Sequence, residues 1–179
     1  MSQPSYYDID DILAVQERVP CVLHADLDGL GSAGSGGASK VQRNSRWALP
    51  FWMADRLNEE DVVDMDISPI FSKRANRMYA ASPESMQLRE ISQHFYQFGL
   101  HLGDLVPEVP QVLRNMYMQR IQRIARIAQQ GGNVDTLDFV QSLDKTEARM
   151  LDLCRQAQGA IVEWQRGHAY ALKKAPALP

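Results

Sequence analysis

The sequence is poor in the residues that build disulfide or metal frameworks. It has two cysteines, Cys21 and Cys154, which are far apart and have no second cysteine at the spacing that zinc ligands use. Its four histidines, at positions 24, 94, 101 and 168, are scattered as well. A structural metal site needs several such ligands close together. We therefore expect no bound metal, no disulfide and two reduced thiols, as is usual in a reducing compartment.

The sequence also lacks a long apolar run. A helix needs roughly 20 consecutive apolar residues to cross a bilayer, and no segment approaches that length. The first residues are acidic, whereas a secretory signal begins with basic residues followed by an apolar stretch. We expect a folded protein without membrane contact. Its 179 residues are 45% hydrophobic, which suffices for one ordinary domain or a compact domain with a small appendage.

Positive charge is scarce in the front of the chain. Residues 1–68 contain 5 basic and 12 acidic residues, a net charge of −7, whereas residues 69–179 contain 14 and 10, a net charge of +4. Binding to nucleic acid depends on lysine and arginine side chains that displace counterions from the phosphates. The front of the chain is therefore a poor candidate for nucleic-acid contact, and its acidity favours a basic protein partner.

The local patterns divide the chain into two parts. In residues 1–68, the segments 19–23 and 61–67 are typical of short strands, and the glycine-rich segment from Gly29 to Lys40 breaks any helix. From residue 69 onward the patterns are helical. We predict a mainly α protein, in which a small β-rich N-terminal domain (1–68) precedes a C-terminal helical bundle domain (69–179).

Proline and glycine mark the expected helices of the second part. The Ser-Pro pairs at 68–69 and 82–83 each place a cap residue before proline at the first helical position, which predicts two helix starts. A longer helix is expected to begin after Pro107 or Pro110 and to end at the glycines 131–132. One flank of this helix carries three arginines: Arg120, Arg123 and Arg126.

The last predicted helix is the longest. Asp144, followed three residues later by Glu147, is typical of a capping box at a helix start. A helix over residues 146–174 would be about 40 Å long, which exceeds the width of a small domain. Its apolar seam therefore needs cover from other helices or from another chain. The seam follows alternating spacings of four and three: Met150, Cys154, Ala157, Ile161, Trp164 and His168.

Two segments dense in aromatic residues precede these helices, at 48–54 and 94–99. Aromatic side chains carry large apolar areas and, in tyrosine and tryptophan, a polar tip, so clusters of them serve a core or a desolvated protein interface. We assign Leu49, Phe51 and Trp52 to packing between the small domain and the helices. The residues predicted to contact other subunits are Phe95, Tyr96, Ile161, Trp164 and His168.

One segment is similar to a catalytic motif. Residues 22–29, with Asp26 and Asp28, resemble the nucleophile strand of haloacid-dehalogenase-type phosphatases. That chemistry also needs parallel strands that supply a hydroxyl group, a lysine and a metal-binding acidic pair, whereas the chain after residue 68 is predicted to be helical. A polar turn is the preferred interpretation. With no catalytic constellation, we expect neither an enzyme nor a cofactor nor a small-molecule substrate.

The arginine-bearing helix offers a further alternative, a stand-alone DNA-binding protein. A face formed by Arg120, Arg123 and Arg126 could follow the phosphates of a strand. It lacks aromatic residues on the same flank on which bases could stack. Solvated or partner-paired arginines are the preferred interpretation, and any DNA contact is expected to be weak or indirect.

Five segments, taken in chain order, carry a family resemblance. The sequence Tyr-Asp-Ile-Asp-Asp-Ile-Leu at 7–13 is followed by Leu-Pro-Phe-Trp-Met-Ala at 49–54 and His-Phe-Tyr-Gln-Phe-Gly at 94–99. Leu-Asp-Lys-Thr-Glu at 143–147 and Trp-Gln-Arg-Gly at 164–167 complete the series. Together they resemble the Psf-three subunits of the eukaryotic GINS complex, collinearly over nearly the whole chain.

The resemblance implies a non-catalytic protein that works in an assembly. Proteins of this family form a heterotetramer with three other GINS subunits. That complex joins the MCM ring and a Cdc-type activator to form the replicative helicase of the nucleus, which acts in initiation and elongation of DNA replication. The resemblance also implies a small N-terminal β-domain followed by a helical domain, in agreement with the division predicted from the local patterns.

Overall fold

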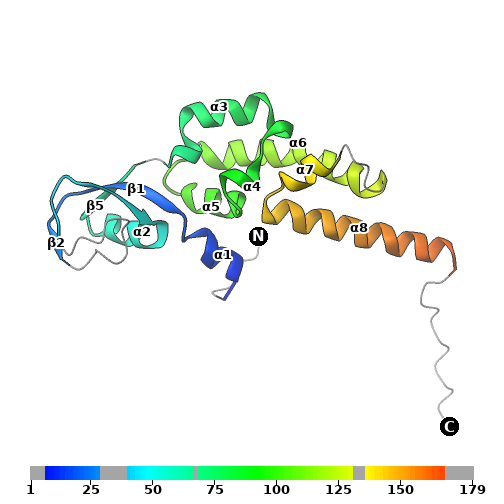
Figure 1. The fold of residues 1–179 in the computed structure, drawn as a ribbon, viewed down its shortest axis with the longest axis horizontal. Coiled ribbons are helices and arrows are strands. Elements are labelled where there is room, and N and C mark those ends of the chain that lie inside the picture. Colours follow the sequence, from blue (N-terminus) through cyan, green and yellow to red (C-terminus); the bar gives the residue numbers. More distant parts are fainter. Residues whose placement is uncertain (1–6, 29–39, 67, 131–135, 168–179) are drawn as a thin grey trace, which may run out of the picture.

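The computed structural model describes residues 7–28, 40–66, 68–130 and 136–167 (Figure 1). A small antiparallel sheet lies near the N-terminal end, and helices make up most of the remainder, which confirms the predicted fold class. No helix within these described ranges is both long and apolar enough to span a membrane. The strands are β1 (Arg18–Leu23), β2 (Leu27–Asp28), β3 (Lys40–Val41), β4 (Arg46–Pro50) and β5 (Val63–Met65). The α-helices are α1 (Ile9–Ala14), α2 (Phe51–Glu59), α3 (Lys73–Ala81), α4 (Leu88–Ile91), α5 (Phe95–Leu102), α6 (Val109–Gln130), α7 (Leu137–Gln141) and α8 (Lys145–Gln165).

The three-stranded sheet is built around β1. Both neighbours, β4 and β5, run antiparallel to it, and Cys21 lies opposite Trp47 on one side and Met65 on the other. Burial alternates along β1, with Val19, Cys21 and Leu23 pointing to the core. This confirms strands in both segments in which the sequence predicted them. The helix α2, which directly follows β4, was not expected from the sequence.

One hydrophobic core joins the sheet to the helices. It contains Val19 and Leu49 from the sheet together with Phe71 and Phe98 from the helical region. The ring of Phe51, at the start of α2, meets the ring of Phe98 edge to face at a centroid distance of 5.8 Å. Because this core is continuous across the chain, a division into domains at residue 68 stays a proposal.

The helical region is organised around α6, which packs against α3, α5 and α8 (Figure 1). Gly99 allows α5 to approach α6 closely, since a Cβ atom there would lie 2.7 Å from Cδ1 of Leu113. The predicted start of α6 near residue 110 and its end before residue 131 are confirmed. The two Ser-Pro pairs open short 3₁₀ turns, Pro69–Phe71 and Pro83–Ser85, so the α-helices begin a few residues later than predicted.

A smaller hydrophobic cluster lies between α6, α7 and α8. It includes Ile124 and Ile127 of α6, Phe139 of α7 and Leu151 of α8. Leu151 is the last buried residue of α8, which continues for fourteen residues beyond it. The first turns of α8 are therefore part of the folded body, while its later turns depart from that body.

Candidate protein interface

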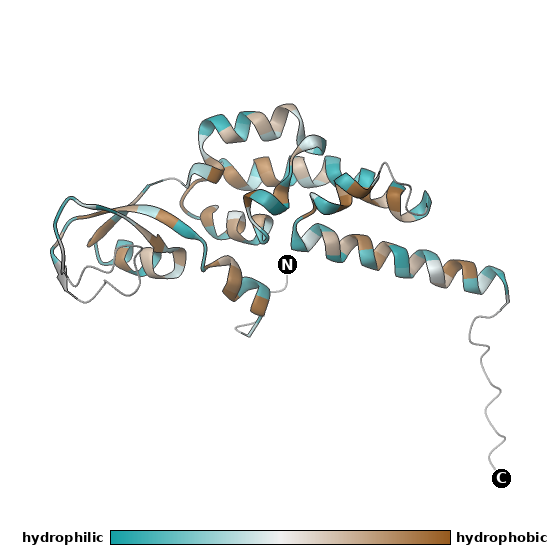
Figure 2. Cartoon of the chain, in the orientation of Figure 1, coloured by the Kyte–Doolittle hydropathy of each residue, from teal (hydrophilic) through white to brown (hydrophobic). Residues whose placement is uncertain are grey.

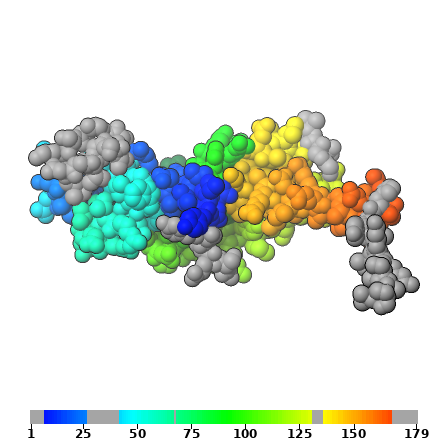
Figure 3. All heavy atoms as spheres, turned by 90° about the horizontal axis from the view of Figure 1, so that it is seen from below, coloured from blue at the N-terminus to red at the C-terminus, as the bar shows by residue number. Residues whose placement is uncertain are grey.

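The C-terminal half of α8 extends beyond the other helices. Two views at right angles show it leaving the body of the molecule (Figures 1 and 3). Hydrophobic residues nevertheless recur along the helix almost to its end (Figure 2). An isolated helix surface in water is normally polar, because exposed apolar side chains gain nothing from solvent. The composition of this projecting half is therefore that of a surface to be covered.

The exposed apolar side chains of α8 form one stripe. The exposed fractions are 51% for Leu153, 49% for Ile161 and 70% for Trp164. Ala157 and Ala160 are also exposed. Separations of three and four residues place all five on one face of the helix. We call Leu153, Ala157, Ala160, Ile161 and Trp164 the α8 stripe.

The α8 helix is shorter than the sequence predicted. It ends at Gln165 instead of continuing to residue 174, and Gly167 adopts a φ angle of +76° just beyond the end. Glycine tolerates this left-handed conformation and commonly terminates helices in this way. At 1.5 Å per residue the helix is about 32 Å long. His168, one of the predicted contact residues, lies outside the described residues.

The other two predicted contact residues need correcting. Phe95 and Tyr96 are both buried within this chain. The ring of Phe95 packs against those of Phe71 and Tyr79, at centroid distances of 5.0 and 5.4 Å. The ring of Phe95 thus joins α5 to α3 and to the 3₁₀ turn at Pro69, and the ring of Tyr96 packs against that of Tyr117 on α6 at a centroid distance of 5.4 Å. Neither ring is available to another chain.

The residues assigned to packing between the two parts divide in a similar way. Leu49 and Phe51 are buried, and the ring of Phe51 contacts those of Phe98 and His101 on α5. Trp52 is 46% exposed and belongs instead to the surface. Two of the three assigned residues therefore lie in the core shared by the sheet and the helices.

A buried ion pair anchors the start of α8 to α6. The guanidinium of Arg120 donates to both carboxylate oxygens of Glu147, with Nε–Oε1 and Nη2–Oε2 distances of 2.7 and 2.9 Å. Both side chains have an exposed fraction of 0%. The Nη1 atom of Arg120 also donates to the carbonyl oxygens of Pro83 and Met86. A bidentate pair in a dry environment fixes geometry strongly, and each partner depends on the other for compensation of its charge.

Tyr96 extends this network to α5. Its hydroxyl group donates to Oε1 of Glu147 at 2.8 Å. Burial, followed by the negative charge of Glu147, raises the pKa of the tyrosine, so its hydroxyl group stays protonated and remains a donor. The network therefore connects α5, α6 and α8, and it sets the direction in which the α8 stripe leaves the body.

The buried pair overturns the predicted arginine face. Arg120 lies inside the molecule and cannot contact DNA phosphates. The guanidinium of Arg123 lies over the ring of Phe139, 4.2 Å from its centroid, and reaches Glu84 at 3.5 Å. Arg126 is exposed. One exposed arginine and one that is stacked and ion-paired do not form the continuous basic face that the DNA-binding alternative required.

Asp144 caps the first turn of α8 from a buried position. Its Oδ1 atom accepts from the backbone N–H of Glu147 at 2.8 Å, which confirms the predicted cap. Its Oδ2 atom accepts from the N–H of Tyr96 at 3.4 Å. Burial raises the pKa of this carboxyl group from 3.8 to about 6, against the opposing effect of these hydrogen bonds. A cap at this site therefore carries a protonation equilibrium near neutral pH.

We expect the stability of this chain to fall as the pH rises from about 4 to about 6. The folded state keeps the Asp144 proton to a higher pH than the unfolded state, so this group favours folding fully below about pH 4, and up to about 3 kcal/mol of that stabilisation is lost by about pH 6. Asp144→Asn removes the titration while keeping one acceptor for the cap. Urea midpoints at about pH 5 and pH 7.5 should differ less in the variant than in the wild type. Equal differences in both proteins would contradict the assignment.

The segment that resembled a phosphatase motif has a different structural setting. The Oδ1 atom of Asp26 accepts from the backbone N–H of Arg43 at 2.7 Å. This hydrogen bond joins the residues just outside the paired strands β2 and β3. The side chain of Asp28 lies outside the described side chains. The strand before Asp26 belongs to an antiparallel sheet and not to the parallel sheet that this chemistry uses. Within the described ranges, no group of three or more acidic, histidine or cysteine side chains is placed to hold a metal.

Sequence reasoning missed the Arg120–Glu147 network, although a signal for it existed. The residues of α6 that are buried follow spacings of three and four, and Arg120 falls within that series. Glu147 precedes the buried Leu151 by one helical turn. A charge of each sign on two apolar faces is a pattern that favours a buried pair. The buried residues of this series are Leu113, Met116, Arg120, Ile124, Ile127 and Ala128.

Comparison with known proteins agrees with the family resemblance seen in the sequence. Residues 7–59 match the family described as the PSF3 N-terminal domain. The chain is similar to the DNA replication complex GINS protein psf3 of Schizosaccharomyces pombe, with 30% identity over 164 residues that cover 89% of this chain and 96% of that protein. The psf3 protein of Aspergillus fumigatus is 30% identical over 170 residues, with the same two coverages. The human PSF3 protein is 26% identical over 181 residues, which cover 93% of this chain and 83% of that protein.

Proposed function

Because this chain belongs to the Psf3 family of GINS proteins, we propose that it is a non-catalytic subunit of a GINS complex that acts in DNA replication. It would assemble with three other GINS subunits into a heterotetramer. Its work would be structural: the sheet and helices hold a surface in place, and other chains cover that surface. This function calls for no cofactor and no bound substrate.

The observation that carries this proposal is the α8 stripe. A projecting helix with Trp164 exposed by 70% leaves apolar area in water that a chain acting alone would hide. A helix from another subunit packs on such a stripe through residues at the same spacings. The buried network at Arg120 and Glu147 supports the proposal further, because it holds the base of α8 rigidly. A partner then binds without first having to order the helix.

Co-expression with the three other GINS subunits of the same organism tests this function. We expect the chain alone to self-associate or to be poorly soluble, and to co-elute with the three partners in equal amounts when all four are produced together. The four-chain product should be monodisperse in size-exclusion chromatography with light scattering. A monodisperse monomer that does not co-elute with the three other subunits would contradict the proposal.

We further propose that the assembled complex acts in the nucleus as an accessory factor of the replicative helicase, in both initiation and elongation. It would join the MCM ring and a Cdc-type activator there and brace the ring that hydrolyses ATP. The acidic front of the chain, with a net charge of −7 over residues 1–68, favours basic protein surfaces over DNA as its contacts. Any contact of this chain with DNA would be weak or indirect.

A further inference from the structure

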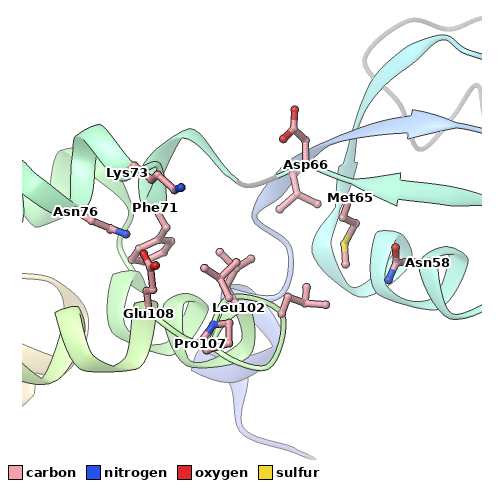
Figure 4. A pocket seen from close by; sticks show the side chains of 12 residues that line it. Asn58, Met65, Asp66, Phe71, Lys73, Asn76, Leu102, Pro107 and Glu108 are labelled. Carbon is pink, nitrogen blue, oxygen red and sulfur yellow. The ribbon is translucent and has the colours of Figure 1, made fainter.

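A cleft opens where the small sheet meets the helices, away from the α8 stripe. It has a volume of about 340 Å³, which is within the range of sites that hold part of a peptide or a small ligand. Its apolar lining comes from separate parts of the chain and includes Val19 of β1. Phe71 of the first 3₁₀ turn and Leu102 of α5 also belong to it (Figure 4). These residues are buried beneath it as members of the shared core. The base of the cleft is therefore rigid and apolar.

Polar groups surround this apolar base. Lys73 and Asn76 reach toward the cleft from α3, and Glu108, just before α6, borders the same side (Figure 4). Asn58 of α2 lies across the cleft from them (Figure 4). Within the described part of the chain, neither Lys73 nor Glu108 has an ion-pair partner. Asp66 also lines the cleft and has an interaction of its own (Figure 4). The cleft thus offers one cation and two carboxylates beside two carboxamides.

The carboxamide of Asn76 carries an unmet hydrogen-bonding requirement. Its Oδ1 atom is buried, and no described group donates a hydrogen bond to it. A buried acceptor without a donor costs free energy, which a bound group that supplies an N–H would recover. A rotation of the amide group would present this acceptor to the cleft, where Asn76 is one of the lining residues.

We propose that this cleft binds a short extended peptide segment of another protein. An extended backbone presents alternating N–H and C=O groups. The side-chain oxygen of an asparagine accepts from such an N–H, and its NH₂ group donates to such a C=O. One bulky aliphatic or aromatic side chain of the peptide occupies the apolar base. A basic residue on one side of it faces Glu108, and an acidic residue on the other side faces Lys73, which fixes the direction of the peptide.

The occupant differs from the partner of the α8 stripe. The stripe is convex and calls for a long helix, whereas the cleft is concave and accommodates only a few residues. Because the cleft lies away from the α8 stripe, which the partner subunits are proposed to cover, we expect it to stay open when the chain is joined to them.

A peptide selection against the co-purified four-subunit complex tests the proposal. The probe is a random twelve-residue peptide library displayed on phage, and enriched sequences are then synthesised with a fluorescent label for anisotropy measurements. Enriched peptides should share one bulky apolar residue flanked by a basic and an acidic residue. Lys73→Glu and Glu108→Lys should each weaken their binding by about three- to tenfold. Arg74→Glu, next to Lys73 but outside the cleft lining, is the matched control and should leave binding unchanged.

Charge exchange separates a direct contact from a general loss of binding. A peptide whose basic residue is replaced by glutamate should recover its affinity for the Glu108→Lys variant and lose it for the wild type. Three results would overturn the proposal: no enriched peptide, equal binding by wild type and both reversals, or binding to the isolated chain but not to the complex. The last would make the cleft part of a subunit contact. Co-purification of the four subunits is measured separately from peptide binding. A failure of peptide binding would therefore not contradict the proposed four-subunit assembly.

Discussion

Replacing Ile161 and Trp164 together by glutamate should abolish co-purification of this chain with the other GINS subunits. Aromatic and large aliphatic anchors at the centre of an interface are each worth about 2 kcal/mol or more. Two carboxylates placed there would also have to give up their water without finding a partner. The combined loss exceeds about 4 kcal/mol, a reduction in affinity of roughly a thousandfold. The measurement is a pull-down of the tagged chain from cells that produce all four subunits.

This effect should be specific to the stripe and should not reflect unfolding. Both residues are exposed, and they lie beyond Leu151, the last buried residue of α8. The doubly substituted chain should therefore keep its far-ultraviolet circular dichroism and become a soluble monomer. The matched control is Arg155→Gln with Gln156→Glu, which changes the net charge by the same amount on exposed positions of α8 outside the stripe. Normal co-purification of the Ile161 and Trp164 variant would remove the stripe from consideration as an interface.

Removing either member of the buried pair should be the most damaging single change to the fold. Arg120→Ala leaves the carboxylate of Glu147 buried and without its cation, and Glu147→Ala leaves the guanidinium in the same position. Breaking a buried pair from one side costs about 3–5 kcal/mol. A domain is stable by only about 5–15 kcal/mol in total, so either change should sharply reduce the soluble yield.

A double-mutant cycle distinguishes the pair from two independent contacts. Arg120→Met combined with Glu147→Leu replaces two charges by apolar groups, so the double variant should be more stable than the sum of the two single changes implies, by about 2 kcal/mol or more. Some loss should remain, because the carbonyl groups of Pro83 and Met86 lose their donor. Urea denaturation is best measured in the Ile161→Glu and Trp164→Glu background, which is expected to be monomeric.

The exposed Arg126 provides the control for this series. It lies on the same helix as Arg120, and Arg126→Ala should change stability by less than about 0.5 kcal/mol. An additive cycle at Arg120 and Glu147 would show that the two charges do not support each other. A large loss at Arg126 would show that helix α6 is sensitive to any change, and the interpretation of Arg120→Ala would then fail.

Local signals predicted several elements correctly. Asp144 and Glu147 mark the start of α8, and the side chain of Asp144 accepts from the predicted backbone N–H. The alternation along β1 and the limits of α6 also follow from the sequence. These features depend on contacts among residues close in the chain. Such contacts form in the same way whatever the tertiary surroundings of the segment. The end of α8 was misjudged because the helix was predicted to continue to residue 174, whereas it ends at Gln165, just before Gly167 with its positive φ angle.

The residues predicted to contact other subunits differ in their exposure. Ile161 and Trp164 are exposed as an interface requires, whereas Phe95 and Tyr96 are buried, although all four are apolar or aromatic residues in helices. Periodicity shows that a helix has an apolar face, but it does not show whether the same chain covers that face. Only the tertiary packing shows that Phe95 is covered by its own chain, through its ring contacts with Phe71 and Tyr79.

The sequence by itself determined the mainly helical fold class, the small sheet before the helices, the caps and the family to which the chain belongs. These follow from local backbone preferences and from the order of motifs along the chain. The tertiary structure alone decided that Arg120 is an internal anchor, that Trp52 lies at the surface and that a cleft with an unpaired Asn76 oxygen opens beside the sheet. Burial and charge pairing depend on which distant segments meet, and the spacing of residues along one helix does not identify the segment that meets it.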